Sequence, residues 1–217
     1  MENLLEIDSV QLRYGERTIL NNIYLKSETG KVTGILGRNG CGKSCLMKLI
    51  FGEIQTNEKS VRINENILLK DYRNPEDMRM LPQFNFLPKY LKVIQVFKYF
   101  DLDFFEFSDL FNEFFNCAQS KIRELSGGNI RIIEIYLILK SNTKFCLLDE
   151  PFSHFSPKNA RIIIEIIKQE KKKKGIILTD HMYNYITEIS DYLYLIKDCV
   201  SYKIDNIDKL KEYGYLR

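Results

Sequence analysis

The stretch GILGRNGCGKSCLMKLI, residues 34–50, decides the fold of this chain. The apolar run at 32–37 predicts a buried strand, and from Lys43 onward apolar residues recur at helical spacing. Between them, residues 37–44 fit the pattern G-x-x-x-x-G-K-[ST] in the strand–turn–helix setting where it has a physical meaning. The sequence therefore predicts a phosphate-binding loop. A glycine turn that arose by chance is the alternative.

The residues of this loop suit a nucleoside triphosphate. Glycines let the backbone N–H groups turn inward, and the start of the helix adds partial positive charge where phosphates would lie. Lys43 can reach the β- and γ-phosphates, and the Ser44 hydroxyl can bind Mg²⁺. The residues expected to contact the nucleotide here are Gly37, Arg38, Asn39, Gly40, Cys41, Gly42, Lys43, Ser44 and Cys45.

Composition narrows the class of protein. The 217 residues suffice for one large domain or for a core with an inserted lobe, and 45% hydrophobic with 28% charged residues is ordinary for a globular protein. A net charge of +3 is too small to support nucleic-acid binding. The five cysteines lack metal-type spacing, so we expect reduced thiols in a cytosolic protein. We expect neither a signal peptide nor a membrane span of roughly 20 apolar residues.

Apolar runs that end in charged residues recur later in the chain, at 144–150, 175–180 and 192–198. Helical patterns at 158–174 and 182–190 separate them. Strands that alternate with helices predict an α/β fold with a mostly parallel sheet covered on both faces.

Residues 84–127 differ from this pattern. They contain many aromatics and few β-branched runs, which predicts an inserted helical subdomain. The phenylalanines either form the core of this lobe or line an exposed groove for a partner helix. Those at helical or near-helical spacing are Phe100, Phe104, Phe107, Phe111, Phe114 and Phe115.

Two acids end the run FCLLDE at 145–150. Successive side chains of a strand point to opposite sides, so Asp149 and Glu150 are expected to divide labour as metal partner and water activator. The alternative is a solvated acidic turn, which the neighbouring phosphate loop disfavours.

Six ordered motifs resemble those of ATP-binding-cassette (ABC) ATPases, and the resemblance covers nearly the whole chain. LSGGN at 125–129 is similar to the signature usually written LSGGQ, and it precedes the strand with Asp149 in the order that family uses. Tyr14 resembles the aromatic that stacks on adenine, and Gln83 the glutamine that senses Mg²⁺ and water. His181 resembles the switch histidine that contacts the γ-phosphate. LLDEPF and LTDHMYNYI look most like the ATPases of lipopolysaccharide export and branched-chain amino-acid uptake.

Each of these single matches has a plainer interpretation. Tyr14 could cap a hairpin, Gln83 could be a surface loop residue, and a lone histidine such as His181 is often structural. His181 nevertheless follows a strand of the expected parallel sheet, and open parallel sheets bind ligands at that end.

The resemblance implies a P-loop NTPase core with an N-terminal antiparallel β region at 1–83 and 128–217. It also implies that ATP and Mg²⁺ bind. The catalytic residues would be Glu150, His181, Gln83 and Lys43, and the metal would be bound through Ser44, Gln83 and Asp149. The signature residues would contact the γ-phosphate held by an opposite subunit, so the resemblance implies a head-to-tail homodimer. These signature residues are Ser126, Gly127 and Gly128.

The chain departs from the family pattern at three positions. Asn129 keeps the amide of the usual glutamine. Ser156 replaces an aspartate that helps to couple the two sites of the dimer, which puts the coupling in doubt. Cys199 stands where a hairpin glycine is usual, so we expect a looser or differently shaped turn.

Three functions are consistent with the sequence. The first is the ATP-hydrolysing subunit of an ABC transporter, on the cytoplasmic face of the membrane and bound to a separate integral membrane subunit. The second is a soluble cassette ATPase in an assembly such as iron–sulfur biogenesis or translation. The third is a nucleotide-binding regulatory subunit with weak turnover, which the Ser156 substitution keeps open.

Overall fold

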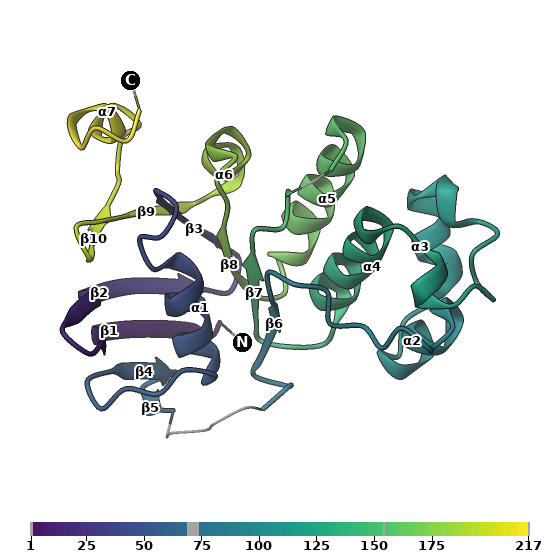
Figure 1. Cartoon of the computed structure of the whole chain (residues 1–217), viewed down its shortest axis with the longest axis horizontal. Coiled ribbons are helices and arrows are strands. Elements are labelled where there is room, and N and C mark those ends of the chain that lie inside the picture. The colour runs from purple at the N-terminus through teal and green to yellow at the C-terminus, as the bar shows by residue number, and fades with distance from the viewer. Residues whose placement is uncertain (1, 69–73, 154, 217) are drawn as a thin grey trace.

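The computed structural model describes residues 2–68, 74–153 and 155–216. His154, to which the sequence assigns no role, lies outside them. The chain forms two β-sheets with one helix between them (Figure 1). The helices from the middle of the chain lie toward the other end of the molecule, whereas the last helix lies near the last two strands. This arrangement confirms the predicted α/β fold with a separate antiparallel β region at the N-terminus.

The first sheet has four antiparallel strands in the order β2-β1-β4-β5. Inward apolar residues of β1 alternate with more exposed ones, as a sheet with one buried face requires. The strands are β1 (Leu4–Tyr14), β2 (Arg17–Glu28), β4 (Ser60–Ile63) and β5 (Asn66–Ile67).

The second sheet has six strands in the order β10-β9-β3-β8-β7-β6, and all but β10 run parallel to their neighbours. Its central strands are buried along their whole length, which explains their unbroken apolar runs. The strands are β3 (Val32–Gly37), β6 (Met78–Leu81), β7 (Phe145–Asp149), β8 (Gly175–Thr179), β9 (Tyr192–Lys197) and β10 (Val200–Lys203).

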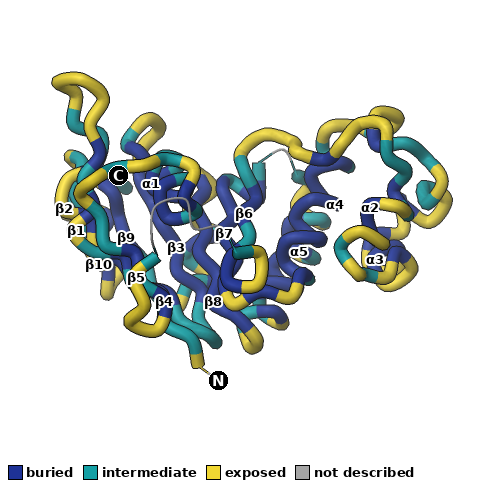
Figure 2. The backbone as a smooth tube through the Cα atoms, turned by 90° about the horizontal axis from the view of Figure 1, so that it is seen from below, coloured by how far each residue is buried: buried dark blue, intermediate teal, exposed yellow. Residues whose placement is uncertain are grey.

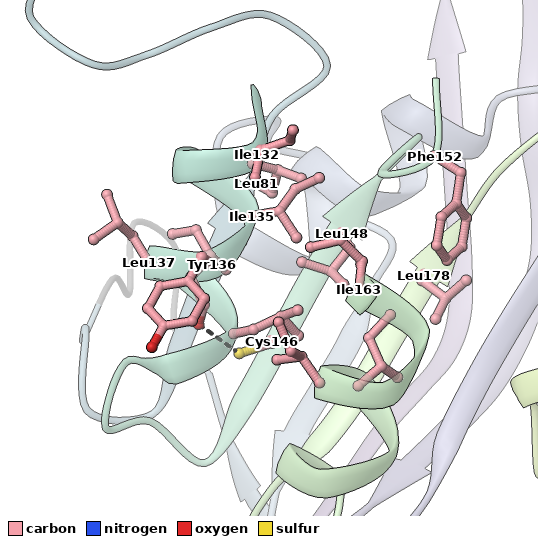
Figure 3. Close-up of a cluster of buried hydrophobic side chains, with 14 of the residues drawn as sticks. Leu81, Ile132, Ile135, Tyr136, Leu137, Cys146, Leu148, Phe152, Ile163 and Leu178 are labelled. Carbon is pink, nitrogen blue, oxygen red and sulfur yellow. Dashed lines mark hydrogen bonds between the residues drawn. The ribbon is translucent and has the colours of Figure 1, made fainter. Parts of the chain in front are cut away.

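Helix α1 (Lys43–Phe51) packs into an apolar cluster that contains residues of both sheets. The other face of the six-stranded sheet is covered by α4 (Gly127–Lys140), α5 (Pro157–Glu170) and α6 (Tyr183–Ile189). Figure 3 shows Ile132 and Ile135 of α4 beside Leu81 and Leu148 at the ends of β6 and β7. The carboxyl ends of these strands are therefore fixed against α4.

The inserted segment is helical. It contains α2 (Val93–Tyr99), α3 (Phe104–Leu110) and 3₁₀ turns at Asn112–Phe114 and Ile122–Glu124. Four of the six predicted phenylalanines are fully buried, so they form the core of this lobe: Phe104, Phe107, Phe111 and Phe114. Phe115 is exposed instead, as are several aromatics outside the predicted spacing. In Figure 2 the outer surface of the lobe is largely exposed around this buried centre.

The C-terminal hairpin corrects one expectation. Lys197 pairs with Val200, so the turn between β9 and β10 has only two residues and stays tight. Asp198 and Cys199 both take positive φ, 50° and 66°, and Cys199 adopts the conformation that a glycine would accept more easily. The chain ends near α7 (Asp208–Glu212). Among the helices of the described residues, none combines the length and the apolar character needed to cross a bilayer.

Candidate functional site

The loop after β3 has the backbone that its glycines predict. Gly40 and Gly42 take φ angles of 79° and 103°, and Gly42 is the N-cap of α1. A Cβ atom on Gly37 would lie 2.4 Å from the Cys41 sulfur and 2.8 Å from the Ile196 carbonyl oxygen. Glycine is therefore required at the strand end for close packing and at the helix start for conformation.

Lys43 is the cation of this loop. Its side chain is almost completely buried, and its ammonium donates hydrogen bonds to the carbonyl oxygens of Gly37 (2.8 Å) and Arg38 (3.3 Å). The lysine thus arches over the loop that precedes it. This holds a positive charge against the loop backbone, as phosphate binding requires.

Two loop side chains line a cavity of their own. Arg38 donates a hydrogen bond to the carbonyl oxygen of Gly214 (3.1 Å), and Arg38 and Cys41 line a separate cavity of about 380 Å³ together with Tyr213 and Tyr215. Burial raises the pKa of the Cys41 thiol, which keeps it protonated at neutral pH. These two predicted contacts therefore line a cavity other than the one around Lys43.

The main cavity, about 690 Å³, gathers all four predicted catalytic residues around the loop. Gln83 comes from the segment after β6, Glu150 follows β7, and His181 follows β8. Side chains from the ends of three neighbouring strands therefore line one cavity. From the loop, this cavity is lined by Asn39, Gly40, Gly42, Lys43, Ser44 and Cys45.

Asp149 has the surroundings of a metal-binding carboxylate. It is fully buried, and its Oδ1 accepts a hydrogen bond from the Thr179 hydroxyl (2.7 Å). Its Oδ2 has no hydrogen-bond partner among the described residues, although a buried oxygen normally has one. Asp149 itself is not among the residues that line the main cavity, where the Ser44 hydroxyl and the Gln83 amide provide further hard oxygens, which Mg²⁺ prefers. These residues therefore fit Mg²⁺.

No cluster of three or more His, Cys, Asp or Glu side chains in the described ranges could hold a metal on its own. Mg²⁺ typically binds proteins through one or two carboxylates, with waters and substrate phosphates completing its shell. A single buried aspartate is therefore sufficient for this ion.

Glu150 contacts Gln83 directly. The Gln83 side-chain amide donates to Glu150 Oε2 (3.2 Å), and the Glu150 backbone N–H donates to the Thr179 carbonyl oxygen (2.9 Å). Glu150 has φ of 52°, a conformation that costs about 1–3 kcal/mol for a residue other than glycine. The strained backbone turns the carboxylate from the strand end toward the cavity.

The neighbouring strand end is organised by Asp180. Its buried carboxylate accepts hydrogen bonds from the backbone N–H groups of Phe152 (2.8 Å) and Met182 (2.9 Å). His181 is half-exposed, with Nδ1 3.4 Å from Asp180 Oδ1. Asp180 thus ties the loop after β7 to the loop that carries His181.

The signature residues open α4. Ser126 is the N-cap and accepts a hydrogen bond from the Asn129 backbone N–H (3.2 Å). Gly127 and Gly128 do not line the main cavity. They line an adjoining one of about 420 Å³ that shares Gln83, Glu150 and Ser153 with the main cavity.

Tyr14 also lies apart from the main cavity. It ends β1, pairs with Arg17 across the hairpin and is 55% exposed. The hairpin position fits the plainer interpretation, and the exposed ring leaves stacking on a base possible as well.

Sequence reasoning missed several residues of the site, including two arginines and a serine. Arg17 and Ser153 line the main cavity, and Arg131 lines the adjoining one. Only the position of Arg17, three residues after Tyr14, offered a signal. Burial lowers the pKa of Arg131 and raises that of Glu134, and the opposite charge of each partner counteracts this effect.

Comparison with known proteins places the chain in a family. The sequence model of the ABC transporter family matches residues 20–153, more than half of the chain. A methionine import ATP-binding protein of Clostridium tetani is 32% identical over 89% of this chain and 66% of that protein. A phosphonates import ATP-binding protein of Fusobacterium nucleatum is 27% identical over 91% of this chain and 90% of that protein.

Solved structures agree on the fold. An ATP-binding subunit of an ABC transporter superposes with a TM-score of 0.81 at 21% identity, covering 97% of this chain and 93% of its own. The ADP conformation of another ATP-binding cassette gives a TM-score of 0.75, also at 21% identity, over 97% and 94%. The chain therefore belongs to the ABC transporter family and has the fold of its ATP-binding cassettes.

Proposed function

We propose that this chain binds ATP with Mg²⁺, hydrolyses it, and uses the cycle to move a separate membrane subunit of a transporter. The observation that carries the proposal is the cavity in which the phosphate loop, Gln83, Glu150 and His181 face one space, with Gln83 bonded to Glu150. The relatives named as import ATP-binding proteins support the transport role.

The residues of the cavity divide the work of phosphoryl transfer. Lys43 and the loop N–H groups hold the β- and γ-phosphates, and Ser44, Gln83 and Asp149 hold Mg²⁺, which neutralises phosphate charge when bound. Glu150 polarises the attacking water.

Gln83 and His181 orient that water and the γ-phosphate from two sides. Because such chemistry depends on positioning and on charge stabilisation, the fixed hydrogen bond between Gln83 and Glu150 is the central geometric support.

The signature residues complete the site from a second copy of the chain. Gly127 and Gly128 line their own cavity and not the one around Lys43, which supports contact with a γ-phosphate held by a head-to-tail partner. An isologous homodimer would hold two ATP molecules between the signature of one copy and the loop of the other. Within each copy we divide the chain into a core, residues 1–83 and 128–217, and a helical subdomain, residues 84–127.

Exposed aromatics support a membrane partner. Phe84 and Tyr90 are 77% and 73% exposed, and both follow Gln83 within a few residues. Solvent-facing aromatics of this size are typical of a surface that receives an apolar helix. We therefore place the chain on the cytoplasmic face of a membrane, bound to an integral membrane subunit and to no nucleic acid.

The test is ATP hydrolysis by the purified chain and by Glu150→Gln. We expect turnover to fall on the order of 10²- to 10⁴-fold, because the amide cannot act as a base, while ATP stays bound. Glu165→Gln, on the exposed side of α5, is the matched control and should keep full turnover. Substantial turnover by Glu150→Gln would remove Glu150 from this role.

The partner is tested with the same variant. Tagged Glu150→Gln with ATP should recover a polytopic membrane protein from native membranes in stoichiometric yield. Recovery of soluble partners alone, with ATP demonstrably bound, would favour the soluble assembly over the transporter.

A further inference from the structure

Two charged side chains are buried in α4, one turn after the signature. Arg131 and Glu134 lie 3.7 Å apart (Nη1 to Oε2) and are 8% and 0% exposed, in a helix otherwise buried by apolar residues. A buried ion pair rarely adds stability compared with apolar residues of similar size. A gain in stability therefore does not explain why this pair is buried, and its contacts indicate another role.

Arg131 joins the two backbone segments that carry Gln83 and Glu150. Its guanidinium donates to the Pro82 carbonyl oxygen (2.5 Å), to that of Asp149 (2.7 Å) and, at 3.5 Å, to that of Glu150. The planar fork of arginine is what allows one side chain to reach carbonyls from separate segments.

Glu134 holds the other end of the same segment. Its Oε1 accepts hydrogen bonds from the backbone N–H groups of Phe86 (2.6 Å) and Leu87 (3.1 Å). The segment from Pro82 to Leu87 is thus fixed to α4 at both ends, with Gln83 inside it.

Helix α4 is a rigid support for these contacts. Ile132 and Ile135 pack on Leu81 and Leu148, directly before the two strand ends (Figure 3). The strained φ of Glu150 persists only where its surroundings determine it, and Arg131 holds the carbonyls on both sides of that residue's N–Cα bond.

We propose that Arg131 and Glu134 are positioning residues that hold Gln83 and Glu150 at hydrogen-bonding distance and link both to the signature helix. The proposal rests on hydrolysis at the site described above. Arg131 aligns the backbone of the water-activating acid, and Glu134 neutralises the guanidinium and anchors the Gln83 segment. A shift of α4 then reaches the reacting groups through these hydrogen bonds.

The pair offers a double variant that separates positioning from folding. Arg131→Met alone leaves a buried, uncompensated carboxylate and is expected to be unstable. Arg131→Met with Glu134→Gln removes both charges at similar volume, and the amide oxygen can still accept from Phe86 and Leu87. We expect its melting temperature to return toward that of the wild type.

Turnover should not return with stability. We expect kcat of the double variant to stay on the order of 10- to 100-fold below the wild type, because a displacement of about 1 Å of the reacting groups costs that much. The ATP bound per chain should be unchanged, since neither residue lines the cavity around Lys43. Arg161→Met, which removes an exposed arginine paired with Glu188, is the control.

The outcomes are distinct. A double variant that binds one ATP per chain and turns over at the wild-type rate overturns the positioning role and leaves the proposed function intact. A loss of kcat matched by an equal loss of bound ATP shows a folding role only, and also overturns it. A wild-type chain with no hydrolysis overturns the proposed function, and the positioning role falls with it.

Discussion

Two helices of this molecule begin at a glycine-rich turn, and the two beginnings are built differently. The turn before α1, residues 37–44, is closed: Gly37 packs against Cys41, and Lys43 is folded over the loop. The turn at the start of α4 is open: a Cβ atom on Gly127, the first residue of the helix, would meet nothing within 4 Å. The first turn is packed against its own side chains, as the phosphate loop that we propose would be, and the second leaves its N–H groups open to a molecule that approaches from outside.

The cations near the two turns show the same contrast. Lys43 lines the main cavity, where a bound phosphate can reach it. Arg131, near the second turn, donates to the backbone carbonyls of Pro82 and Asp149. The open turn therefore contributes N–H groups and a helix dipole, which are effective once another molecule supplies the phosphate.

The largest expected effect tests whether the two turns meet across a dimer. Lys43→Met removes the charge of the closed turn. Gly127→Asp puts a carboxylate where phosphates would approach the open one, and an acid at a helix start does not harm folding. Each variant alone should lose nearly all turnover.

A mixture of the two variants should regain activity. In a head-to-tail dimer, each mixed pair has one site with both changes and one intact site, so equal amounts should restore about a quarter of wild-type turnover. Steady-state ATPase assays of titrated mixtures measure this. No recovery at any ratio, with dimers demonstrably exchanged, would contradict the shared site and leave the two turns unrelated.

Stability provides a smaller contrast between the two turns. Gly42→Ala forces a Cβ into a φ of 103° and within 2.9 Å of Leu20 Cδ2. We expect it to lower the free energy of unfolding by about 1–3 kcal/mol. Gly127→Ala meets no atom and improves helix propensity, so stability should stay level or rise by up to about 1 kcal/mol. Denaturant unfolding measures the free energy of unfolding of both variants. An equal loss of this free energy in the two would show that the second turn is as constrained as the first.

Local signals in the sequence explain which parts of the site could be predicted. The closed turn, the strand before it and the two acids at the end of β7 are each specified by residues within one short stretch. The strand Val32–Gly37 and the helix start at Lys43 lie where the pattern predicts them. The assignment of Gln83 and His181 depended on resemblance, and their meeting in one cavity with Glu150 agrees with it. Their catalytic roles stay predictions.

Contacts between distant segments could not be read in the same way. Arg131 sits in a helical pattern that favours an apolar core, and its partners lie 49 and 18 positions away in the chain. Arg17 reaches the cavity only because β1 and β2 form a hairpin beside the loop. Such residues become candidates once the fold has placed their backbone partners.

The smallest expected effect concerns Ser156, where the resemblance predicts an aspartate. Ser156 caps α5 by accepting a hydrogen bond from the Asn159 N–H (3.3 Å), and aspartate caps a helix equally well. Ser156→Asp should therefore change the free energy of unfolding by less than about 0.5 kcal/mol, whereas Ser156→Ala should cost about 1 kcal/mol.

The effect of Ser156→Asp should appear in cooperativity. The resemblance gives the aspartate a part in coupling the two sites, so its return should raise the Hill coefficient for ATP hydrolysis, while Ser156→Ala leaves that coefficient unchanged. Rate measurements across ATP concentrations, on dimers of both variants, test this. An unchanged coefficient in a stable Ser156→Asp dimer would show that the loop after Glu150 couples the sites through other residues. The partner copy would then supply the open turn with a phosphate, but residue 156 would not couple hydrolysis at the two sites.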